Sequence, residues 1–92
     1  MTVQRRLTIS NALGLHARAA ARFVKVASQF QSRITVSRGT RTVDGKSILG
    51  LLLLAAARGR EIEIAAEGSD EREALEALAE LVERGFEDAA TI

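Results

Sequence analysis

His16 is the only histidine of the chain, and it stands where a glycine-containing turn over 11–15 meets the start of a predicted helix. Imidazole is the side chain that ordinarily changes charge near neutral pH, so it can act there as a nucleophile or base. The backbone N–H groups of a helix's first turn, here those of Ala17 and Arg18, favour an anion such as a phosphoryl group. Arg18 adds a planar cation whose donors match phosphate oxygens. This short segment therefore combines a nucleophile, an anion site and a counter-charge.

A structural interpretation of the same residues stays open at this point. A lone histidine at a helix start is often a cap or a surface residue, and an arginine beside it is often solvated. No second acid or base accompanies His16 in the sequence, so hydrolytic catalysis has little support. The chain has no GxxxxGK[ST] nucleotide loop and no cysteine, and one histidine leaves too few ligands for a transition-metal site. We therefore expect neither a metal nor a cofactor.

The periodicity of apolar residues and the turn residues between them predict the elements that position His16. We expect strands over 2–10, 33–37, 40–43 and 61–67, and helices over 17–30, over 48–54 and between Asp70 and Gly85. Ser47 is a natural N-cap for the second helix, and Asp70 with Glu73 has the pattern of a capping box for the third. The apolar stripe of the third helix comprises Ala74, Leu75, Leu78, Leu81 and Val82.

The element order βαββαβα predicts an α+β open-faced sandwich, in which three helices cover one face of a four-stranded antiparallel sheet. Residues 1–88 would form this single domain, with 89–92 as a frayed tail, and fraying would begin near Phe86. The other face of the sheet would meet water. Its expected residues are Gln4, Arg6, Arg33, Thr35, Glu61 and Glu63.

The net charge of +1 conceals a strong asymmetry along the chain. Residues 1–60 carry eleven Lys or Arg against one acid, whereas residues 61–92 carry two Arg against eleven acids. Such a split can mark a surface for nucleic acid or another acidic partner. Alternatively, the two halves interleave in the sheet and neutralise one another across strands. Without Trp or Tyr the chain lacks an aromatic platform for single-stranded nucleic acid, so we expect no nucleic-acid partner.

No segment of the sequence predicts membrane insertion or export. The apolar run over 48–57 is about half of the ~20 residues that a membrane span requires. Polar residues interrupt the segment after Arg5 and Arg6, so it lacks the apolar stretch of a signal peptide. We expect a cytoplasmic protein, with a monomer as the default state.

Two motifs resemble those of a known family. The segment Gly14-Leu15-His16-Ala17-Arg18 resembles the active-site motif of HPr, the histidine-containing phosphocarrier of the bacterial phosphoenolpyruvate-dependent sugar phosphotransferase system. The segment 46–51, Lys-Ser-Ile-Leu-Gly-Leu, is similar to the second signature of that family. The element order fits the family's fold along essentially the whole chain.

The resemblance implies a phosphoryl carrier that is not an enzyme in its own right. Enzyme I, charged from phosphoenolpyruvate, would transfer a phosphoryl group to Nδ1 of His16, and an enzyme IIA domain would then take it for sugar uptake. Arg18 and the backbone N–H of Ala17 would hold the phosphoryl oxygens. The family motif normally continues with proline, whereas this chain has Ala19. That loss of pre-organisation should cost well under ~1 kcal/mol.

The resemblance also gives Ser47 a second role beside capping. In many bacteria an HPr kinase/phosphorylase modifies the matching serine, and a dianion there would repel acidic partner surfaces. In the helix that follows, we expect Ile48 and Leu51 to be core, and Leu49 and Leu52 to form an exposed apolar patch near His16. The resemblance implies that this patch docks enzyme I and enzyme IIA domains. Cations along the first helix would ring this patch, namely Arg18, Arg22 and Lys25.

Other functions remain as alternatives to sugar uptake. The nitrogen-regulatory branch of the family uses the same chemistry for signalling, and the sequence does not separate the two branches. A purely regulatory binding module would act through Ser47 and ignore His16, but the presence of His16 with Arg18 weighs against it. A small nucleic-acid-binding domain is the third alternative.

Overall fold

The helices and strands follow one another in the predicted order within residues 2–87, the part of the chain that the computed structural model describes. The elements are β1 (Thr2–Thr8), α1 (Ala17–Ala27), β2 (Arg33–Arg38), β3 (Arg41–Asp44), α2 (Ile48–Leu54), β4 (Glu61–Glu67) and α3 (Glu71–Glu83), followed by the short 3-10 helix η1 (Gly85–Glu87). The four strands form one antiparallel sheet in the order β1-β4-β2-β3. The predicted open-faced sandwich is confirmed.

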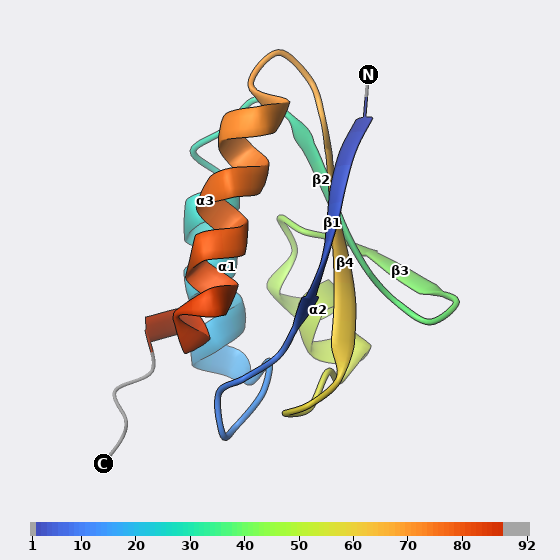
Figure 1. Cartoon of the computed structure of the whole chain (residues 1–92), viewed down its shortest axis with the longest axis vertical. Coiled ribbons are helices and arrows are strands. Elements are labelled where there is room, and N and C mark those ends of the chain that lie inside the picture. Colours follow the sequence, from blue (N-terminus) through green and yellow to red (C-terminus); the bar gives the residue numbers. More distant parts are fainter. Residues whose placement is uncertain (1, 88–92) are drawn as a thin grey trace.

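The helices α1 and α3 lie side by side along one face of the sheet, which Figure 1 shows nearly edge-on. The inward side chains of the central strands β2 and β4, such as Val36 and Ile64, are fully buried beneath them. Phe23 of α1 and Leu78 of α3 complete this core. Every residue of the apolar stripe predicted for α3 is buried, as its helical spacing requires.

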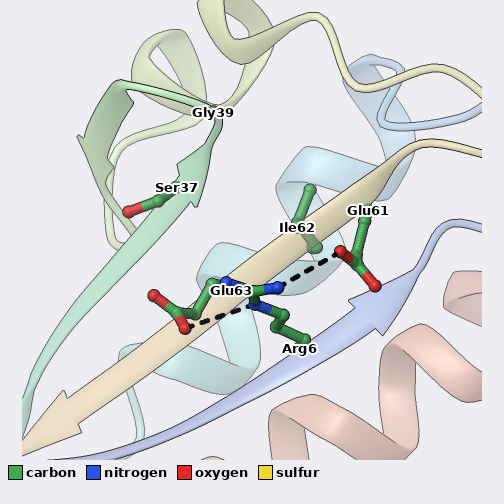
Figure 2. Close-up of a pocket in the computed structure, with 6 residues that line it drawn as sticks. All are labelled: Arg6, Ser37, Gly39, Glu61, Ile62 and Glu63. Atoms are coloured by element: carbon green, nitrogen blue, oxygen red, sulfur yellow. Dashed lines mark ion pairs between the residues drawn. The ribbon is translucent and has the colours of Figure 1, made fainter.

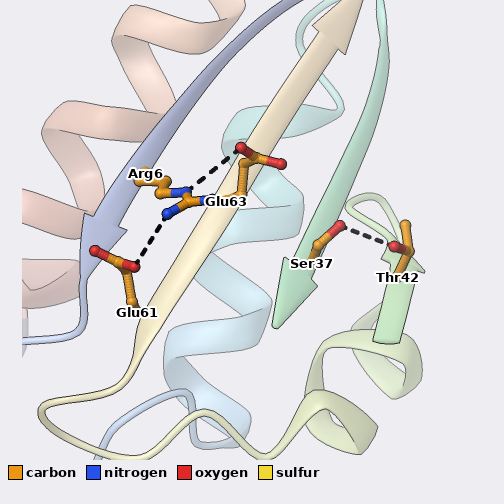
Figure 3. A network of polar contacts seen from close by, with 5 residues as sticks. All are labelled: Arg6, Ser37, Thr42, Glu61 and Glu63. Atoms are coloured by element: carbon orange, nitrogen blue, oxygen red, sulfur yellow. Dashed lines mark hydrogen bonds and ion pairs between the residues drawn. The ribbon is translucent and has the colours of Figure 1, made fainter. Parts of the chain in front are cut away.

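The outer face of the sheet interleaves basic and acidic side chains. Arg6 of β1 lies opposite Glu63 of β4 in the strand register. Its guanidinium is 3.8 Å from the carboxylates of both Glu61 and Glu63, as Figure 3 shows. The opposite charges of the two halves of the chain therefore meet across neighbouring strands, and the interleaving interpretation of the charge asymmetry is confirmed here. Each such exposed pair contributes little to stability, about 0–1 kcal/mol.

Beside these ion pairs, the outer face has a shallow hollow of about 260 Å³ (Figure 2). Its polar lining includes Ser37, whose hydroxyl lies 2.9 Å from that of Thr42 on β3. The hollow contains none of the residues predicted to act in phosphoryl transfer. Its full lining is Arg6, Ser37, Gly39, Glu61, Ile62 and Glu63.

The first helix is shorter than predicted, because α1 ends at Ala27 and not at Phe30. Ser28 is its C-cap, and the N–H groups of Gln29 and Phe30 donate to the carbonyls of Val26 and Ala27 in tighter turns. Phe30 still packs partly buried against the core, so its apolar character matched the helical pattern without its backbone being helical.

The capping box predicted at Asp70 is wrong, since this carboxylate makes no hydrogen bond to its own helix. Instead it accepts from the N–H groups of Gln31 and Ser32 at 2.8 and 2.9 Å, and from the hydroxyl of the fully buried Ser32 at 2.5 Å. These bonds lower the pKa of Asp70 below its ordinary value of 3.8, the Ser32 hydroxyl having the largest effect. Glu71 instead accepts from the N–H of Gly68 at 3.0 Å. Asp70 therefore fastens the start of α3 to the segment before β2.

The expectation that the chain frays from Phe86 is also wrong at Phe86 itself. Gly85 ends the last helix as predicted, with φ of +64°, but the side chain of Phe86 is then fully buried in the core. A phenylalanine buried here offsets the entropy of ordering the segment, because its apolar area leaves water. The tail predicted over 89–92 lies outside the described residues.

Candidate functional site

His16 is the N-cap residue of α1 and is half-buried. Its backbone is extended, and its carbonyl accepts the first intrahelical bond, from the N–H of Ala20 at 2.8 Å. The ring nitrogen Nδ1 accepts from the backbone N–H of Arg18 at 3.3 Å. Nδ1 therefore directs its lone pair at the first-turn amides, and a neutral ring in this pose carries its proton on Nε2. The nitrogen that can attack phosphorus is thus the one beside the anion-binding helix end.

The loop before His16 is held by close backbone contacts. Gly14 has a φ of +65°, and a Cβ there would lie only 2.6 Å from the carbonyl oxygen of Ala56 and 2.9 Å from Cα of Ala57. The N–H of the buried Leu15 donates to that same carbonyl at 2.9 Å. Glycine at this position therefore meets two demands, a left-handed backbone and an approach without room for a side chain. The loop lies directly on the segment between α2 and β4.

Ser47 caps α2 as predicted, because its hydroxyl accepts from the N–H of Gly50 at 3.0 Å. The turn before it is built by Asp44, whose carboxylate accepts from the N–H of Lys46 at 2.9 Å. The ammonium of Lys46 reaches across to the carbonyl of Phe30 at 2.8 Å. These bonds determine where the half-buried Ser47 side chain stands.

The apolar patch on α2 is larger than the sequence indicated. Leu51 is buried, and Leu49 and Leu52 are exposed, as predicted. Ile48, predicted to be core, is 42% exposed, because the inward positions of this seven-residue helix are Leu51 and Leu54 and its first turn lies beyond them. Two further exposed leucines were missed. Leu53 is 58% exposed, and Leu13, in the loop before His16, is 67% exposed.

The sequence did indicate that a leucine such as Leu53 would be exposed, because α2 contains more leucines than one stripe of a short helix can bury. Nothing in the periodicity of the sequence pointed to Leu13. With it, exposed leucines occur both on α2 and in the loop that leads to His16.

The cations predicted to ring the patch differ in their contacts. Arg18 and Lys25 are exposed on α1. Arg22 is half-buried, and its guanidinium donates to the carbonyls of Phe86 and Glu87 at 2.8 and 2.9 Å. The sequence could not predict these two bonds, because each joins residues more than sixty positions apart.

Two arginines of the β2–β3 hairpin hold the other end of α2. Arg38 donates to the carbonyl of Leu54, and Arg41 donates to that of Leu53, each at 2.8 Å. The last carbonyls of a helix lack partners inside it, so these guanidinium groups complete its C-terminus. The hairpin therefore supports the helix that carries Ser47 and the apolar patch.

Among residues 2–87, no group of three or more His, Cys, Asp or Glu side chains is placed to hold a metal ion. Over the same residues, no helix has the length and apolar character needed to cross a membrane.

Known proteins of similar sequence and structure identify the family of this chain. The family described as PTS HPr component phosphorylation site matches residues 3–84. A phosphocarrier protein HPr from Xylella fastidiosa is 46% identical over 86 residues, which cover 94% of this chain and 97% of that protein. A phosphocarrier protein NPr from Shewanella violacea is 40% identical over 88 residues, which cover 96% and 97%. The crystal structure of HPr-C-His from Thermoanaerobacter tengcongensis has a TM-score of 0.90 at 42% identity and covers 94% of this chain and 97% of that one. The chain therefore belongs to the HPr family of phosphocarrier proteins of the phosphotransferase system.

Proposed function

We propose that His16 accepts a phosphoryl group from enzyme I, charged by phosphoenolpyruvate, and passes it to an enzyme IIA domain. The observation that carries this proposal is the position of Nδ1, which lies at the N-terminus of α1 within hydrogen-bonding distance of the Arg18 amide. The Nδ1 lone pair attacks phosphorus as the bond to the donor breaks, and the proton on Nε2 stays in place. The second transfer reverses these events, with the acceptor's nucleophile attacking and Nδ1 leaving.

The chain supplies part of each transfer site, and its partner supplies the rest. When phosphorus bonds to Nδ1, the N–H of Arg18 is released from that nitrogen and can donate to a phosphoryl oxygen. The N–H of Ala17 and the guanidinium of Arg18 add further donors at the same helix end. Transfer of this kind depends mainly on alignment and charge neutralisation, which supports a carrier with a covalent phosphohistidine intermediate and not an independent enzyme.

The exposed leucines of α2 support a docking role for this face. We propose that Leu49 and Leu52 contact enzyme I and enzyme IIA domains, with Arg18, Arg22 and Lys25 attracting acidic partner surfaces. Long-range attraction of this kind raises association rates and weakens as salt is added. The patch carries no buried charge of its own, so contact with an apolar partner surface has a small desolvation cost.

Ser47 supports a regulatory proposal in addition to its structural role. An HPr kinase/phosphorylase would convert the capping hydroxyl to a dianion beside Leu49. The phosphate oxygens can still accept from the amides at the start of α2, so the helix need not unfold. The added charge would repel an acidic partner, and docking would weaken.

The nitrogen-regulatory branch is a second candidate, because a phosphocarrier protein NPr from Shewanella is 40% identical to this chain, against 46% for the Xylella HPr. The chemistry at His16 is common to both branches, so only the acceptor differs. Offering the phosphorylated protein to purified enzyme IIA domains of the sugar and nitrogen branches, and comparing the transfer rates, would assign it. We also propose that the protein acts in the cytoplasm, because the series of phosphoryl transfers starts from phosphoenolpyruvate. We expect it to act as a monomer, which analytical ultracentrifugation would test.

The central experiment is incubation with phosphoenolpyruvate and a cognate enzyme I. We expect acid-labile phosphoryl incorporation that is lost in His16→Ala. Ser47→Ala is the matched control, since it removes the other proposed modification site and should leave incorporation intact. An enzyme I that phosphorylates another HPr but not this chain would contradict the proposal, as would equal incorporation in His16→Ala.

A further inference from the structure

Asn11 is a buried polar residue, 8% exposed, at the start of the loop that leads to His16. Its side-chain Nδ2 donates to the carbonyl of Gly14 at 2.7 Å. Its own carbonyl accepts from the N–H of Gly14 at 3.1 Å. Side chain and backbone of one residue therefore hold Gly14 from both sides, which closes the loop into a defined turn.

The carbonyl of Gly14 connects Asn11 to His16. The backbone N–H of His16 donates to this carbonyl at 2.9 Å, so one oxygen accepts from the Asn11 side chain and from the His16 backbone. The orientation of that peptide group therefore affects the backbone of His16 directly. Because His16 is also the N-cap of α1, a rotation of its backbone would move Nδ1 relative to the helix amides.

The backbone at the end of the last helix passes close to Asn11. A Cβ added at Gly85 would meet Cβ of Asn11 at 3.4 Å, so little space separates the two segments. The next residue, Phe86, is buried, and its carbonyl accepts from Arg22 of α1 at 2.8 Å. The segment Gly85–Glu87 thus lies next to the loop before His16 and is hydrogen-bonded to the helix after it.

We propose that Asn11 is a positioning residue that sets the direction of the His16 ring for phosphoryl transfer, with the segment Gly85–Glu87 as its support. This inference rests on the function proposed for His16. In-line transfer requires the attacking nitrogen to be placed to within about 1 Å, and a misplacement of that size can slow a reaction by about 100-fold. Asn11 itself does not touch the phosphoryl group, and acts through the Gly14 carbonyl.

Asn11→Ala and Asn11→Asp test this proposal together. The alanine variant removes the bond to Gly14, and the aspartate variant keeps the shape but replaces the N–H donors with a carboxylate oxygen that faces a carbonyl. The control is Ser32→Ala, which removes the hydroxyl bond to Asp70; Ser32 follows the C-terminal end of α1, whereas His16 caps its N-terminal end. Each purified protein would be compared for unfolding temperature, for the rate of phosphoryl transfer from enzyme I and for the ¹⁵N chemical shifts of the His16 ring.

We expect both Asn11 variants to transfer about 10- to 100-fold more slowly and to show altered ring shifts. Ser32→Ala should lose thermal stability but keep wild-type ring shifts and a transfer rate within about two-fold, because its lost bond lies far from the loop. Unchanged ring shifts in both Asn11 variants, with wild-type transfer rates, would overturn the proposal. Ring shifts altered equally in Ser32→Ala would also overturn it, since the effect would then be general destabilisation.

The outcome separates this proposal from the one on which it rests. If the wild-type chain takes no phosphoryl group from an active enzyme I, the proposed function fails. If the wild-type chain is phosphorylated and the Asn11 variants are phosphorylated equally fast, only the positioning role fails.

Discussion

Replacing Arg22 by methionine should separate a structural role from an electrostatic one on the same helix. Lys25→Met is the matched partner, since both changes remove one positive charge from α1 and keep an unbranched apolar stem. The guanidinium of Arg22 donates to two carbonyls of the segment after α3, at 2.8 and 2.9 Å, whereas the Lys25 side chain is exposed. The two variants therefore differ in hydrogen bonds while their change in net charge is equal.

The expected loss of stability follows from those two bonds. A hydrogen bond to a charged group contributes about 1.5–3 kcal/mol when buried, and less where water competes. One bond here is partly buried and the other is exposed, so we expect Arg22→Met to lower the free energy of unfolding by roughly 1–2 kcal/mol. For a domain of this size, each kcal/mol shifts the unfolding temperature by about 4–8 °C. Lys25→Met should change the free energy of unfolding by at most about 0.5 kcal/mol.

Thermal unfolding followed by circular dichroism measures the structural part, and stopped-flow association with enzyme I at low salt measures the electrostatic part. We expect the association rates of both variants to fall by similar factors, because steering depends on charge. Charge reversal at both positions should enlarge that effect. Equal unfolding temperatures for the two variants would refute the structural role of Arg22. Association rates that charge reversal leaves unchanged at low salt would refute the steering role.

Two further outcomes test the fastening of α3 and the first turn of α1. Because the folded state lowers the pKa of Asp70, chiefly through the Ser32 hydroxyl, the ionised carboxylate stabilises the fold. That contribution is complete above the ordinary value of 3.8 and is lost as the pH falls through the lowered pKa. Asp70→Asn should therefore unfold at a lower temperature at neutral pH and lose less stability in acid, and parallel stability–pH curves for the two proteins would contradict this. Ala19→Pro should change the free energy of unfolding by under ~1 kcal/mol, as urea titration would show, because the first helical turn tolerates proline. A larger destabilisation would mean that the Ala19 N–H takes part in the folded structure.

The resemblance to HPr and the geometry of the site answer different questions. The motif around His16 identified the family, and the comparisons confirm that identification. The geometry adds how the ring is held, with Nδ1 at the helix amides and the preceding loop fastened to Ala56. The transfer that we propose for His16 requires such alignment, so the proposal concerns the loop over 11–15 as well as the histidine.

Capping residues, turn residues and apolar periodicity in the sequence predicted most of the helices and strands. They also predicted the starts of α1 and α2, the helices that His16 and Ser47 cap. Ser47 caps α2 as predicted, and α2 spans the predicted residues, because a cap and its amide lie three positions apart. His16 stands at the start of α1 for the same kind of reason, after a glycine that alone fits its turn. Strand periodicity likewise predicted which side chains face the core and which face water.

The features at Asp70, Arg22 and Ile48 that local patterns did not predict depend on residues far apart in the chain. Asp70 has the sequence pattern of a cap, yet its partner Ser32 lies 38 positions away. Arg22 has the pattern of a surface cation, yet it bonds to the carbonyl of Phe86, 64 positions away. Ile48 is exposed because the core ends beside the first turn of α2, and no local pattern marks that boundary. Capping, turns and periodicity depend on residues a few positions apart, so they can be predicted from the sequence. Which distant groups bond to the carboxylate of Asp70, or donate to the carbonyl of Phe86, depends on how the finished elements pack, and only the tertiary structure decides it.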